Sequence, residues 1–382
     1  MDNKVHVLIV ADYISRNSGV SSVVMNYYTH IDHSKIQMDF LLYKEPEEEY
    51  LEYFQKFGSK VYFSGYPSEI GLRHYEKEIE NFFKTHKNEY TVVHVHIPNA
   101  AFVVLKYAKK HGVKTRIIHS HNSRGADNRF KKMRNYLLNK IGISYANQYF
   151  ACSKSAGEYL YGKKKNSQIV VINNAIELDK YFYNPESRTA IRKQLDVGDE
   201  ILLGHVGRFS EQKNHRFLIE VANQLKIAGV KFKLLLIGGG ELEKDIREQI
   251  EELKLKEFVI FTGIVSNVKE YMDAMDVFLL PSLYEGLPCV CVEAQANGLP
   301  CMLSSNITRE VELTDSIHFL DVAEPAVWSD MIIKMIDSAE LSDKRQDNER
   351  MTLSKYDIVI QGKNLEERYL SYGNSTDIDV NL

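Results

Sequence analysis

Short apolar runs alternate with segments of helical length along most of the chain, and this alternation restricts the possible fold more than any other feature. Eleven runs have the length and composition of buried strands: Val5–Val10, Met38–Leu42, Lys60–Phe63, Val92–His96, Arg116–His119, Gln148–Ala151, Ile201–Val206, Phe232–Ile237, Val259–Phe261, Val277–Leu280 and Pro300–Leu303. Helical segments separate them: Val20–His30, Glu47–Phe57, Tyr75–Lys84, Ala101–His111, Arg216–Ile227, Glu241–Leu253, Asn267–Met275, Pro288–Asn297 and Val327–Ala339. Such alternation predicts an α/β fold in which helices wrap parallel sheets.

A polar interval divides this pattern into two units. The chain has 382 residues, 44% of them hydrophobic, which is enough for two domains with a core each. The segment Asn173–Glu200 lacks a clean period, and we place the boundary there: an N-terminal domain over residues 1–180 and a C-terminal domain over residues 181–354. No apolar run approaches the ~20 residues that span a bilayer, and the N-terminus lacks the pattern of a signal peptide. We therefore expect a cytoplasmic protein.

Charge is distributed unevenly along the chain. The formal net charge is −4, yet residues 101–165 contain 15 Lys and Arg against 2 Asp and Glu, a local balance of +13. This asymmetry is typical of a surface for anionic partners such as acidic lipids or phosphorylated molecules, although a solvated face has the same composition. Between residues 129 and 140, apolar and basic side chains alternate as in an amphipathic helix, which either lies on an anionic membrane or packs on its own domain.

Two glutamates mark the richest motif, LLPSLYEGLPCVCVEAQANGLP. An expected strand ends at Leu280, and Pro288 suits the first position of the following helix because its φ angle is fixed. Glu285 lies in the loop before that helix, and Glu293 follows eight residues later in its second turn. Backbone amides at a helix start bind anions, and carboxylates accept hydrogen bonds from sugar hydroxyls. The motif therefore indicates a phosphorylated ligand that is rich in hydroxyl groups.

Other polar groups follow strands in the same way. Arg208 and Lys213 come directly after the strand Ile201–Val206, where two cations are suited to a diphosphate. Three glycines, residues 238–240, form a tight turn after the next strand, but they do not match the dinucleotide-binding pattern. Near the N-terminus, Gly19 opens a helix, where the absence of a Cβ allows a ligand to approach the backbone.

In this order, these segments resemble the retaining nucleotide-sugar glycosyltransferases of family 4, and the spacing Glu-x7-Glu is the most specific point of resemblance. The family has the GT-B fold, with two facing Rossmann-like domains and a deep cleft between them. The resemblance implies that Tyr356–Tyr372, within residues 355–375, forms a helix that crosses back to the N-terminal domain. It further implies a hexosyltransferase that uses a nucleoside-diphosphate sugar as donor, with neither a cofactor nor a metal ion.

The resemblance also implies roles for individual residues. Catalysis would depend on Glu285, His119, Arg208 and Lys213, and the donor would contact Gly19, Arg208, Lys213, Gly263, Ile264, Glu285, Gly286, Leu287 and Glu293. Within this set, Glu293 would bind the ribose, Glu285 the transferred sugar, the two cations the diphosphate, and Thr262–Ile264 the base. Many members have two adjacent glycines where this chain has Ser18 and Gly19. Retention would proceed by attack on the same face of the sugar, with the leaving phosphate taking the acceptor proton.

Four histidines at two strand ends permit a different interpretation. His94, His96, His119 and His121 follow an i, i+2 pattern that places both members of each pair on one strand face, as in a metal site. A metal-dependent hydrolase is therefore one alternative, and a non-catalytic protein that binds sugar nucleotides is another. Under the resemblance, His119 would line the sugar site, with His96 and Asn99 on the acceptor side.

The acceptor implied by the resemblance and by the basic region is a lipid-linked saccharide or an oligosaccharide at the inner face of the plasma membrane. The closest resemblance is to members that assemble bacterial capsular polysaccharide and exopolysaccharide, judged by the segment EGLPCVCVEAQANGLPCMLSSNITREVELT. We expect a hexose or N-acetylhexosamine donor built on uridine diphosphate, the nucleotide that such enzymes commonly use. We expect no nucleic-acid partner and, at most, peripheral contact with an anionic membrane.

Overall fold

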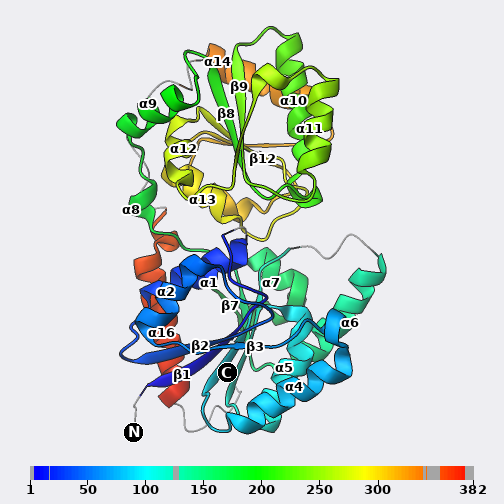
Figure 1. The fold of residues 1–382 in the computed structure, drawn as a ribbon, viewed down its shortest axis with the longest axis vertical. Coiled ribbons are helices and arrows are strands. Elements are labelled where there is room, and N and C mark those ends of the chain that lie inside the picture. Colours follow the sequence, from blue (N-terminus) through cyan, green and yellow to red (C-terminus); the bar gives the residue numbers. More distant parts are fainter. Residues whose placement is uncertain (1–3, 17, 124–128, 339–340, 342–352, 375–382) are drawn as a thin grey trace. The chain divides into compact units, whose positions relative to one another are not determined.

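The computed structural model describes residues 4–16, 18–123, 129–338, 341 and 353–374. The chain forms two compact units, one of residues 1–175 and 358–382 and the other of residues 176–357. Figure 1 shows that each unit consists of a sheet with helices packed around it. Some sequence expectations concern residues outside the described ranges: positions 124–128 of the basic region, Ala339, positions 342–352 and position 375.

The first unit is built on a parallel sheet of seven strands in the order β3-β2-β1-β4-β5-β6-β7. The strands are β1 Val5–Val10, β2 Ile36–Leu42, β3 Val61–Phe63, β4 Val92–Val95, β5 Thr115–Ser120, β6 Gln148–Ala151 and β7 Ile169–Val171. In the centre, Val7 of β1 pairs with Met38 on one side and with Val92 on the other. The central strands are covered on both faces, which explains their nearly continuous apolar sequence.

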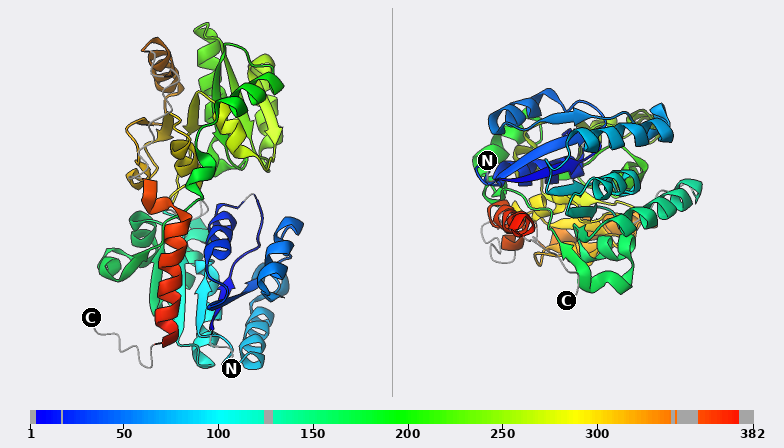
Figure 2. Two further views of the ribbon diagram at one scale, coloured as in Figure 1. Left: turned by 90° about the vertical axis from the view of Figure 1, so that its left-hand side faces the viewer. Right: turned by 90° about the horizontal axis from the view of Figure 1, so that it is seen from below.

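Eight described helices surround this sheet. They are α1 Gly19–His30, α2 Glu48–Phe57, α3 Pro67–Ile70, α4 Leu72–Thr85, α5 Ala101–Lys110, α6 Arg129–Tyr145, α7 Lys154–Tyr161 and α16 Ile358–Asn374. Serine side chains cap two of them, since Ser18 and Ser153 accept hydrogen bonds from backbone amides of α1 and α7. Figure 2 shows α16, drawn in red, running beside the strands of this unit. A Cβ at Gly362 would lie 3.0 Å from the carbonyl oxygen of His30, so the glycine permits close packing of α16 on α1.

The second unit repeats the architecture with six parallel strands in the order β10-β9-β8-β11-β12-β13. The strands are β8 Ile201–Val206, β9 Phe232–Ile237, β10 Val259–Gly263, β11 Val277–Leu280, β12 Cys301–Ser304 and β13 Ile317–Leu320. The described helices are α8 Leu178–Tyr181, α9 Pro185–Gln194, α10 His215–Ile227, α11 Glu243–Glu252, α12 Val268–Ala274, α13 Cys289–Ala296 and α14 Pro325–Asp337. Two buried clusters form the core, one containing Trp328 and the other Met275.

The expected α/β fold with two Rossmann-like units is confirmed, and three local expectations need correction. The polar interval contains helices α8 and α9, because Asn184 caps α9 and Pro185 occupies its first turn. Strands β7 and β13 were not expected, since three or four residues at a sheet edge produce a weak pattern. Pro288 is the N-cap of α13 rather than its first residue, with an extended ψ of 118°.

Both sheets share a feature that determines where ligands bind. In each, the strand order reverses direction beside the first strand, between β1 and β4 in the first unit and between β8 and β11 in the second. Ligands of doubly wound sheets bind beyond the carboxyl ends of the strands at this point, where the loops diverge and leave space. Among the described helices of both units, none is long and apolar enough to cross a membrane.

Candidate active site

Two loops of the second unit meet at its switch point. One follows β8 and leads through a short 3-10 helix, Glu211–Lys213, to α10; the other follows β11 and leads to α13. The backbone N–H of Leu283 donates to the carbonyl oxygen of Gln212 at 2.8 Å, and the Gln212 side-chain amide donates to the Tyr284 carbonyl oxygen at 2.9 Å. These hydrogen bonds hold the two loops together, and with them the charged residues that each loop carries.

Lys213 and Glu285 form an ion pair across these loops. Lys213 Nζ lies 2.6 Å from Glu285 Oε1, and the two side chains are 17% and 10% exposed. A charge-assisted hydrogen bond in a poorly hydrated position is stronger than the same bond at the surface. The structure therefore brings together a cation and a carboxylate that the sequence places 72 positions apart.

Arg208 has a different environment from Lys213. Its guanidinium donates through Nε and an Nη atom to Glu241 Oε2, at 3.1 and 3.0 Å. Both side chains are more than half exposed, 60% for Arg208 and 54% for Glu241. Exposed pairs of this kind contribute at most about 1 kcal/mol. A ligand anion can therefore replace Glu241 at a small cost.

Glu293 lies on α13, where Tyr181 donates a hydrogen bond to its carboxylate. Removal of the carboxylate from water raises the pKa of Glu293 to about 7, and the hydrogen bond from Tyr181 opposes this shift. The carboxyl group therefore changes its protonation state near neutral pH. Tyr181 ends the short helix α8, in the polar interval that lacks a clean period.

Gly263 and Ile264 lie beside the triple-glycine turn. The backbone N–H of Gly238 donates to the Gly263 carbonyl oxygen at 2.9 Å, and a Cβ at Gly239 would lie 3.5 Å from the Ile264 side chain. Ile264 is 53% exposed, which leaves an apolar surface next to the turn. A Cβ at Gly238 would lie 2.2 Å from the Gly207 carbonyl oxygen, so only glycine fits there.

In the first unit, the switch point is bordered by the start of α1 and the loop after β4. Ser18 caps α1, since its hydroxyl accepts from the backbone N–H of Ser21 at 3.3 Å. Apart from its chain neighbours and the backbone of its own helix, no atom of the described residues lies within 4 Å of the position that a Cβ of Gly19 would occupy, so the backbone is open to approach on this side. Asn99 lies in the 3-10 helix Pro98–Ala100 after β4, three residues after His96 in the sequence.

The four histidines form two hydrogen-bonded pairs. His94 Nε2 lies 3.0 Å from His119 Nδ1, and His96 Nδ1 lies 2.9 Å from His121 Nε2. The pairs stack, with ring centroids 4.2 Å apart for His94 and His96 and 4.1 Å apart for His119 and His121. Burial lowers the pKa of His94 to about 3 and that of His121 to about 4, and it holds the pKa values of the other two well below their usual range. All four are therefore neutral near pH 7.

Three of these histidines are close enough together to be considered as metal ligands. Ligand atoms of His94, His96 and His119 lie within 4.8 Å of one another. However, both ring nitrogens of His94 already take part in hydrogen bonds, one to His119 and one to Tyr369. A metal ion bound by His94 would have to displace one of these bonds. The cluster accommodates a hydrogen-bond network without further change.

Helix α6 carries the basic and apolar side chains of the expected amphipathic segment. Its C-terminal part packs on α5, since a Cβ at Gly142 would lie 3.0 Å from Ala101. Its N-terminal part extends beyond the rest of the unit (Figure 1). Large apolar side chains are exposed there and along one side of the helix: Phe130 87%, Met133 61%, Tyr136 52%, Leu137 53% and Ile141 46%. The C-terminal part of α6 therefore packs on its own domain, and contact of the exposed apolar side chains with a membrane stays a prediction.

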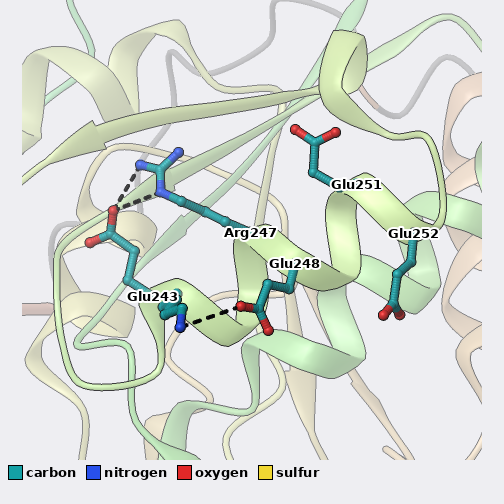
Figure 3. Close-up of a pocket in the computed structure, with 6 residues that line it drawn as sticks. Glu243, Arg247, Glu248, Glu251 and Glu252 are labelled. Carbon is teal, nitrogen blue, oxygen red and sulfur yellow. Dashed lines mark hydrogen bonds and ion pairs between the residues drawn. The ribbon is translucent and has the colours of Figure 1, made fainter.

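A hollow of about 670 Å³ lies on the second unit. It follows one side of α11 and is lined by four glutamates, Lys244 and Arg247 (Figure 3). Arg247 pairs with Glu243 at 2.7 Å and Lys244 with Glu248 at 3.7 Å, each within one helical turn. This is a solvated helix face with internal ion pairs, and it contains none of the site residues expected from sequence.

Three partners of the site residues were missed by sequence analysis. They are Tyr181, which donates to Glu293, Glu241, which pairs with Arg208, and Tyr369, which bonds His94. Glu241 follows the triple-glycine turn directly, and this position next to a strand end was the available signal. Tyr181 and Tyr369 lie on helices far along the chain from their partners, so no local pattern identifies them.

Family models match both units. The model described as "Glycosyltransferase Family 4" matches residues 17–180, and that described as "Glycosyl transferases group 1" matches residues 187–352. The chain is 32% identical over 323 residues to the putative glycosyltransferase EpsF of Bacillus subtilis (strain 168), which covers 83% of this chain and 84% of that protein.

Two further relatives have names that describe a reaction or process. A galactosyltransferase of Escherichia coli, "UDP-Gal:alpha-D-GlcNAc-diphosphoundecaprenol alpha-1,3-galactosyltransferase", is 32% identical over 36% of this chain and 37% of its own length. The capsular polysaccharide biosynthesis glycosyltransferase CapH of Staphylococcus aureus is 25% identical over 75% of this chain and 78% of its own length.

Among solved structures, the Anabaena protein HepE in complex with UDP-glucose has the same fold. The TM-score is 0.79, with 18% identity over 96% of this chain and 99% of that one. At this identity the similarity concerns the fold alone. Taken with the relatives above, these similarities favour neither the metal-dependent hydrolase nor the non-catalytic binding protein.

Proposed function

This chain belongs to the family 4 glycosyltransferases, and from that premise we propose which reaction it catalyses. It is a glycosyltransferase of polysaccharide biosynthesis. In our proposal it transfers a hexose or N-acetylhexosamine, with retention at the anomeric carbon, from a uridine-diphosphate sugar to a lipid-linked saccharide or oligosaccharide. The UDP-glucose complex of HepE and the name of the Escherichia coli galactosyltransferase support this choice of donor and acceptor.

The observation that carries the proposal is the contact between Lys213 and Glu285 at the switch point of the second unit. Breaking the bond between the anomeric carbon and oxygen leaves negative charge on the diphosphate and positive charge on the sugar ring. A cation and a carboxylate held 2.6 Å apart offer each developing charge a group of the opposite sign. In the proposal, Lys213 stabilises the diphosphate while Glu285 orients sugar hydroxyls and lies near the charged ring.

Arg208 supplies a second cation for the diphosphate. Its planar guanidinium is suited to bidentate binding of phosphate oxygens, and its exposed pair with Glu241 is weak enough to exchange. With Arg208 and Lys213 both engaged, two positive charges face the leaving group. We therefore propose that transfer proceeds without a metal ion.

The remaining donor contacts follow from the neighbouring turns. The Glu293 carboxylate, which also accepts a hydrogen bond from Tyr181, accepts hydrogen bonds from the ribose hydroxyls. The exposed side chain of Ile264 and the backbone at Gly263 form the surface on which the base rests. The amides of Gly286 and Leu287, before the N-cap of α13, point toward the phosphates in our proposal.

The first unit binds the transferred sugar and the acceptor. Gly19 leaves open backbone at the start of α1, while His119 near the end of β5 and His96 and Asn99 after β4 lie at the same edge of the sheet. The acceptor hydroxyl attacks the face of the sugar that the diphosphate leaves, and its proton passes to the departing phosphate oxygen. No covalent intermediate with the protein is required.

We further propose that α6 holds the enzyme at the inner face of an anionic membrane. The exposed apolar side chains of α6 alternate with Lys131, Lys132, Arg134 and Lys140. Basic residues attract anionic lipid headgroups, and exposed aromatic and aliphatic side chains enter the interface between headgroups and acyl chains. This arrangement would place the enzyme where lipid-linked acceptors are found.

A transfer assay tests the proposed reaction. The purified protein is incubated with radiolabelled UDP-galactose, UDP-glucose or UDP-N-acetylglucosamine and a polyprenyl-diphosphate-linked sugar, and the label is followed into the organic phase. NMR coupling constants of the product then report the anomeric configuration. Transfer with an α-linked product from an α-linked donor supports the proposal. Inversion, or transfer from nucleotide sugars of another base only, contradicts it.

A further inference from the structure

The histidine pair His94–His119 is connected to the C-terminal helix of the chain. The hydroxyl group of Tyr369, on α16, lies 2.7 Å from His94 Nδ1, and His94 Nε2 lies 3.0 Å from His119 Nδ1. Tyr369, His94 and His119 are each at most 1% exposed. These three side chains, from α16, β4 and the end of β5, therefore form a hydrogen-bonded chain inside the first unit.

The number of hydrogens on each group determines which group donates and which accepts in this hydrogen-bonded series. The Tyr369 hydroxyl has one hydrogen, and burial raises the pKa of this group well above its usual range, so the hydrogen stays in place. His94 Nδ1 is its hydrogen-bond partner among the described residues. A buried hydroxyl that does not donate leaves its hydrogen unpaired, which costs about 1–3 kcal/mol. Tyr369 therefore donates, and His94 Nδ1 accepts.

This direction determines the tautomers of both histidines. A neutral imidazole carries one N–H and one lone pair. Because His94 accepts at Nδ1, its hydrogen is on Nε2 and is donated to His119 Nδ1. His119 in turn accepts at Nδ1, so its hydrogen is on Nε2. Burial and the neighbouring imidazoles keep the pKa values of both rings low enough to exclude a second proton at neutral pH.

The last group in this hydrogen-bonded series, His119 Nε2, lacks an acceptor for its hydrogen within the described part of the protein. His119 Nε2 is buried and has no hydrogen-bond partner among the residues that the structure describes. A buried N–H without an acceptor is unfavourable by about 1–3 kcal/mol, and such groups in native proteins call for an explanation. His119 is the penultimate residue of β5, near the edge of the sheet where ligands of this fold bind.

We propose that Tyr369 is a positioning residue that acts through His94 to hold His119 as the Nε2–H tautomer, so that His119 donates a hydrogen bond to an oxygen of the bound sugar. This inference rests on the proposed function for the identity of the ligand. His119 then serves as a hydrogen-bond donor and not as a base, since it has no free lone pair.

The test uses NMR of the full-length protein with 15N-labelled histidine. Two-bond couplings between the ring carbon-bound hydrogens and the nitrogens distinguish the Nε2–H from the Nδ1–H tautomer. The chain has 13 histidines, and signals are assigned by comparison with the His94→Gln and His119→Gln variants. We expect Nε2–H for both His94 and His119 in the wild-type protein. An Nδ1–H tautomer at either residue overturns the proposal.

Removal of the Tyr369 hydroxyl tests its role. In Tyr369→Phe, His94 Nδ1 loses its donor, and we expect His119 to become a mixture of tautomers. Because His119 then loses part of its hydrogen bond to the sugar, we expect the kcat of Tyr369→Phe to fall about tenfold. The KM for the donor should remain nearly unchanged. The matched control is Tyr372→Phe, on the same helix, whose hydroxyl bonds Gln148 Oε1 at 3.2 Å. Equal effects of the two substitutions on kcat and tautomers contradict the inference.

The His94→Gln variant separates positioning from general stability. A glutamine amide at this position donates to His119 Nδ1 without help from Tyr369, so Tyr369→Phe should have no further effect on kcat in that background. An additive loss contradicts the inference. The tautomer measurement requires no turnover. If the protein neither binds nor uses sugar nucleotides but shows the expected tautomers, the proposed function fails while the tautomer assignment stands.

Discussion

Lys213 and Glu285 lie 72 residues apart in the chain, and their charged groups meet at 2.6 Å in the second unit. Each follows a different strand on either side of the switch point, β8 for Lys213 and β11 for Glu285. Both side chains are mostly buried. Because removal of one partner leaves the other charge poorly solvated, this contact links the stability of the site to its chemistry.

The Lys213→Ala substitution is expected to affect turnover and stability together. Loss of a preorganised positive charge should reduce kcat roughly 10²-fold. Loss of the mostly buried ion pair with Glu285 should lower the free energy of unfolding by about 1–3 kcal/mol. Kinetics and urea denaturation measure the two effects. In the double variant Lys213→Met, Glu285→Gln, stability should recover but turnover should not. Arg216→Ala, which breaks an exposed pair with Asp245, is the control and should change neither quantity much.

The Arg208→Ala substitution should reduce turnover without a large loss of stability. Its pair with Glu241 is exposed, so the free energy of unfolding should change by less than about 1 kcal/mol. Turnover should still fall roughly 10²-fold, because the diphosphate loses its bidentate partner. Glu241→Gln should leave kcat intact and should not raise KM for the donor, since it frees Arg208. Near-normal turnover in Arg208→Ala would remove Arg208 from the diphosphate site.

Glu293 should make stability depend on pH near neutrality. Its pKa is raised from 4.5 to about 7 in the folded protein, so the folded state holds this proton more tightly than the unfolded state. The contribution to stability is fully present below pH 4.5 and is lost as the pH rises through 7. Its size is at most about 3–4 kcal/mol, at about 1.4 kcal/mol per pKa unit.

The comparison that isolates this effect is the difference in unfolding free energy between wild type and Glu293→Gln, measured from pH 5 to 8. We expect wild type to lose stability relative to the variant as the pH rises. The buried histidines contribute equally to the pH dependence of stability in both proteins, so their contribution cancels in the difference. Affinity for a UDP-sugar should increase over the same range in wild type only, because ribose hydroxyls donate to the ionised carboxylate. A difference that does not vary with pH would contradict the assignment.

Membrane binding through α6 is tested with vesicles. We expect wild-type protein to sediment with vesicles containing phosphatidylglycerol and to remain unbound with pure phosphatidylcholine at moderate salt. The triple variant Phe130→Ser, Met133→Ser, Leu137→Ser should bind at least tenfold more weakly, since these side chains are more than half exposed. The control is Ile227→Ser, an apolar residue 72% exposed in the second unit. Equal binding by both variants would rule out α6 as the contact.

The strands and most helices could be predicted because apolar runs such as Val277–Leu280 reflect burial on both faces of a parallel sheet. The short edge strand β7 could not, since three residues carry too little pattern. Helix α9 was missed because its buried side is narrow and includes Ile191 as its one buried residue.

The candidate site, like the fold, could be predicted from sequence only in part. The positions of Arg208, Lys213 and Glu285 after strands were available from sequence, because loops at carboxyl ends of strands are recognisable. The different partners of the two cations were not, since Glu241 and Glu285 reach them through tertiary contacts. The bonds from Tyr181 to Glu293 and from Tyr369 to His94 also required the structure, because each joins elements that are distant in the chain.

The most direct measurement of the central claim is binding of nucleotides to the purified protein by thermal shift, with and without EDTA. The panel contains the diphosphates of uridine, guanosine, adenosine, cytidine and thymidine, and the proteins are wild type, Lys213→Ala and Arg216→Ala. We predict that uridine diphosphate raises the Tm of wild type and Arg216→Ala in proportion to its excess over Kd, that EDTA leaves this shift unchanged, and that Lys213→Ala loses most of it. No shift with any nucleotide, or a shift abolished by EDTA, would contradict a metal-independent donor site at Lys213 and Glu285.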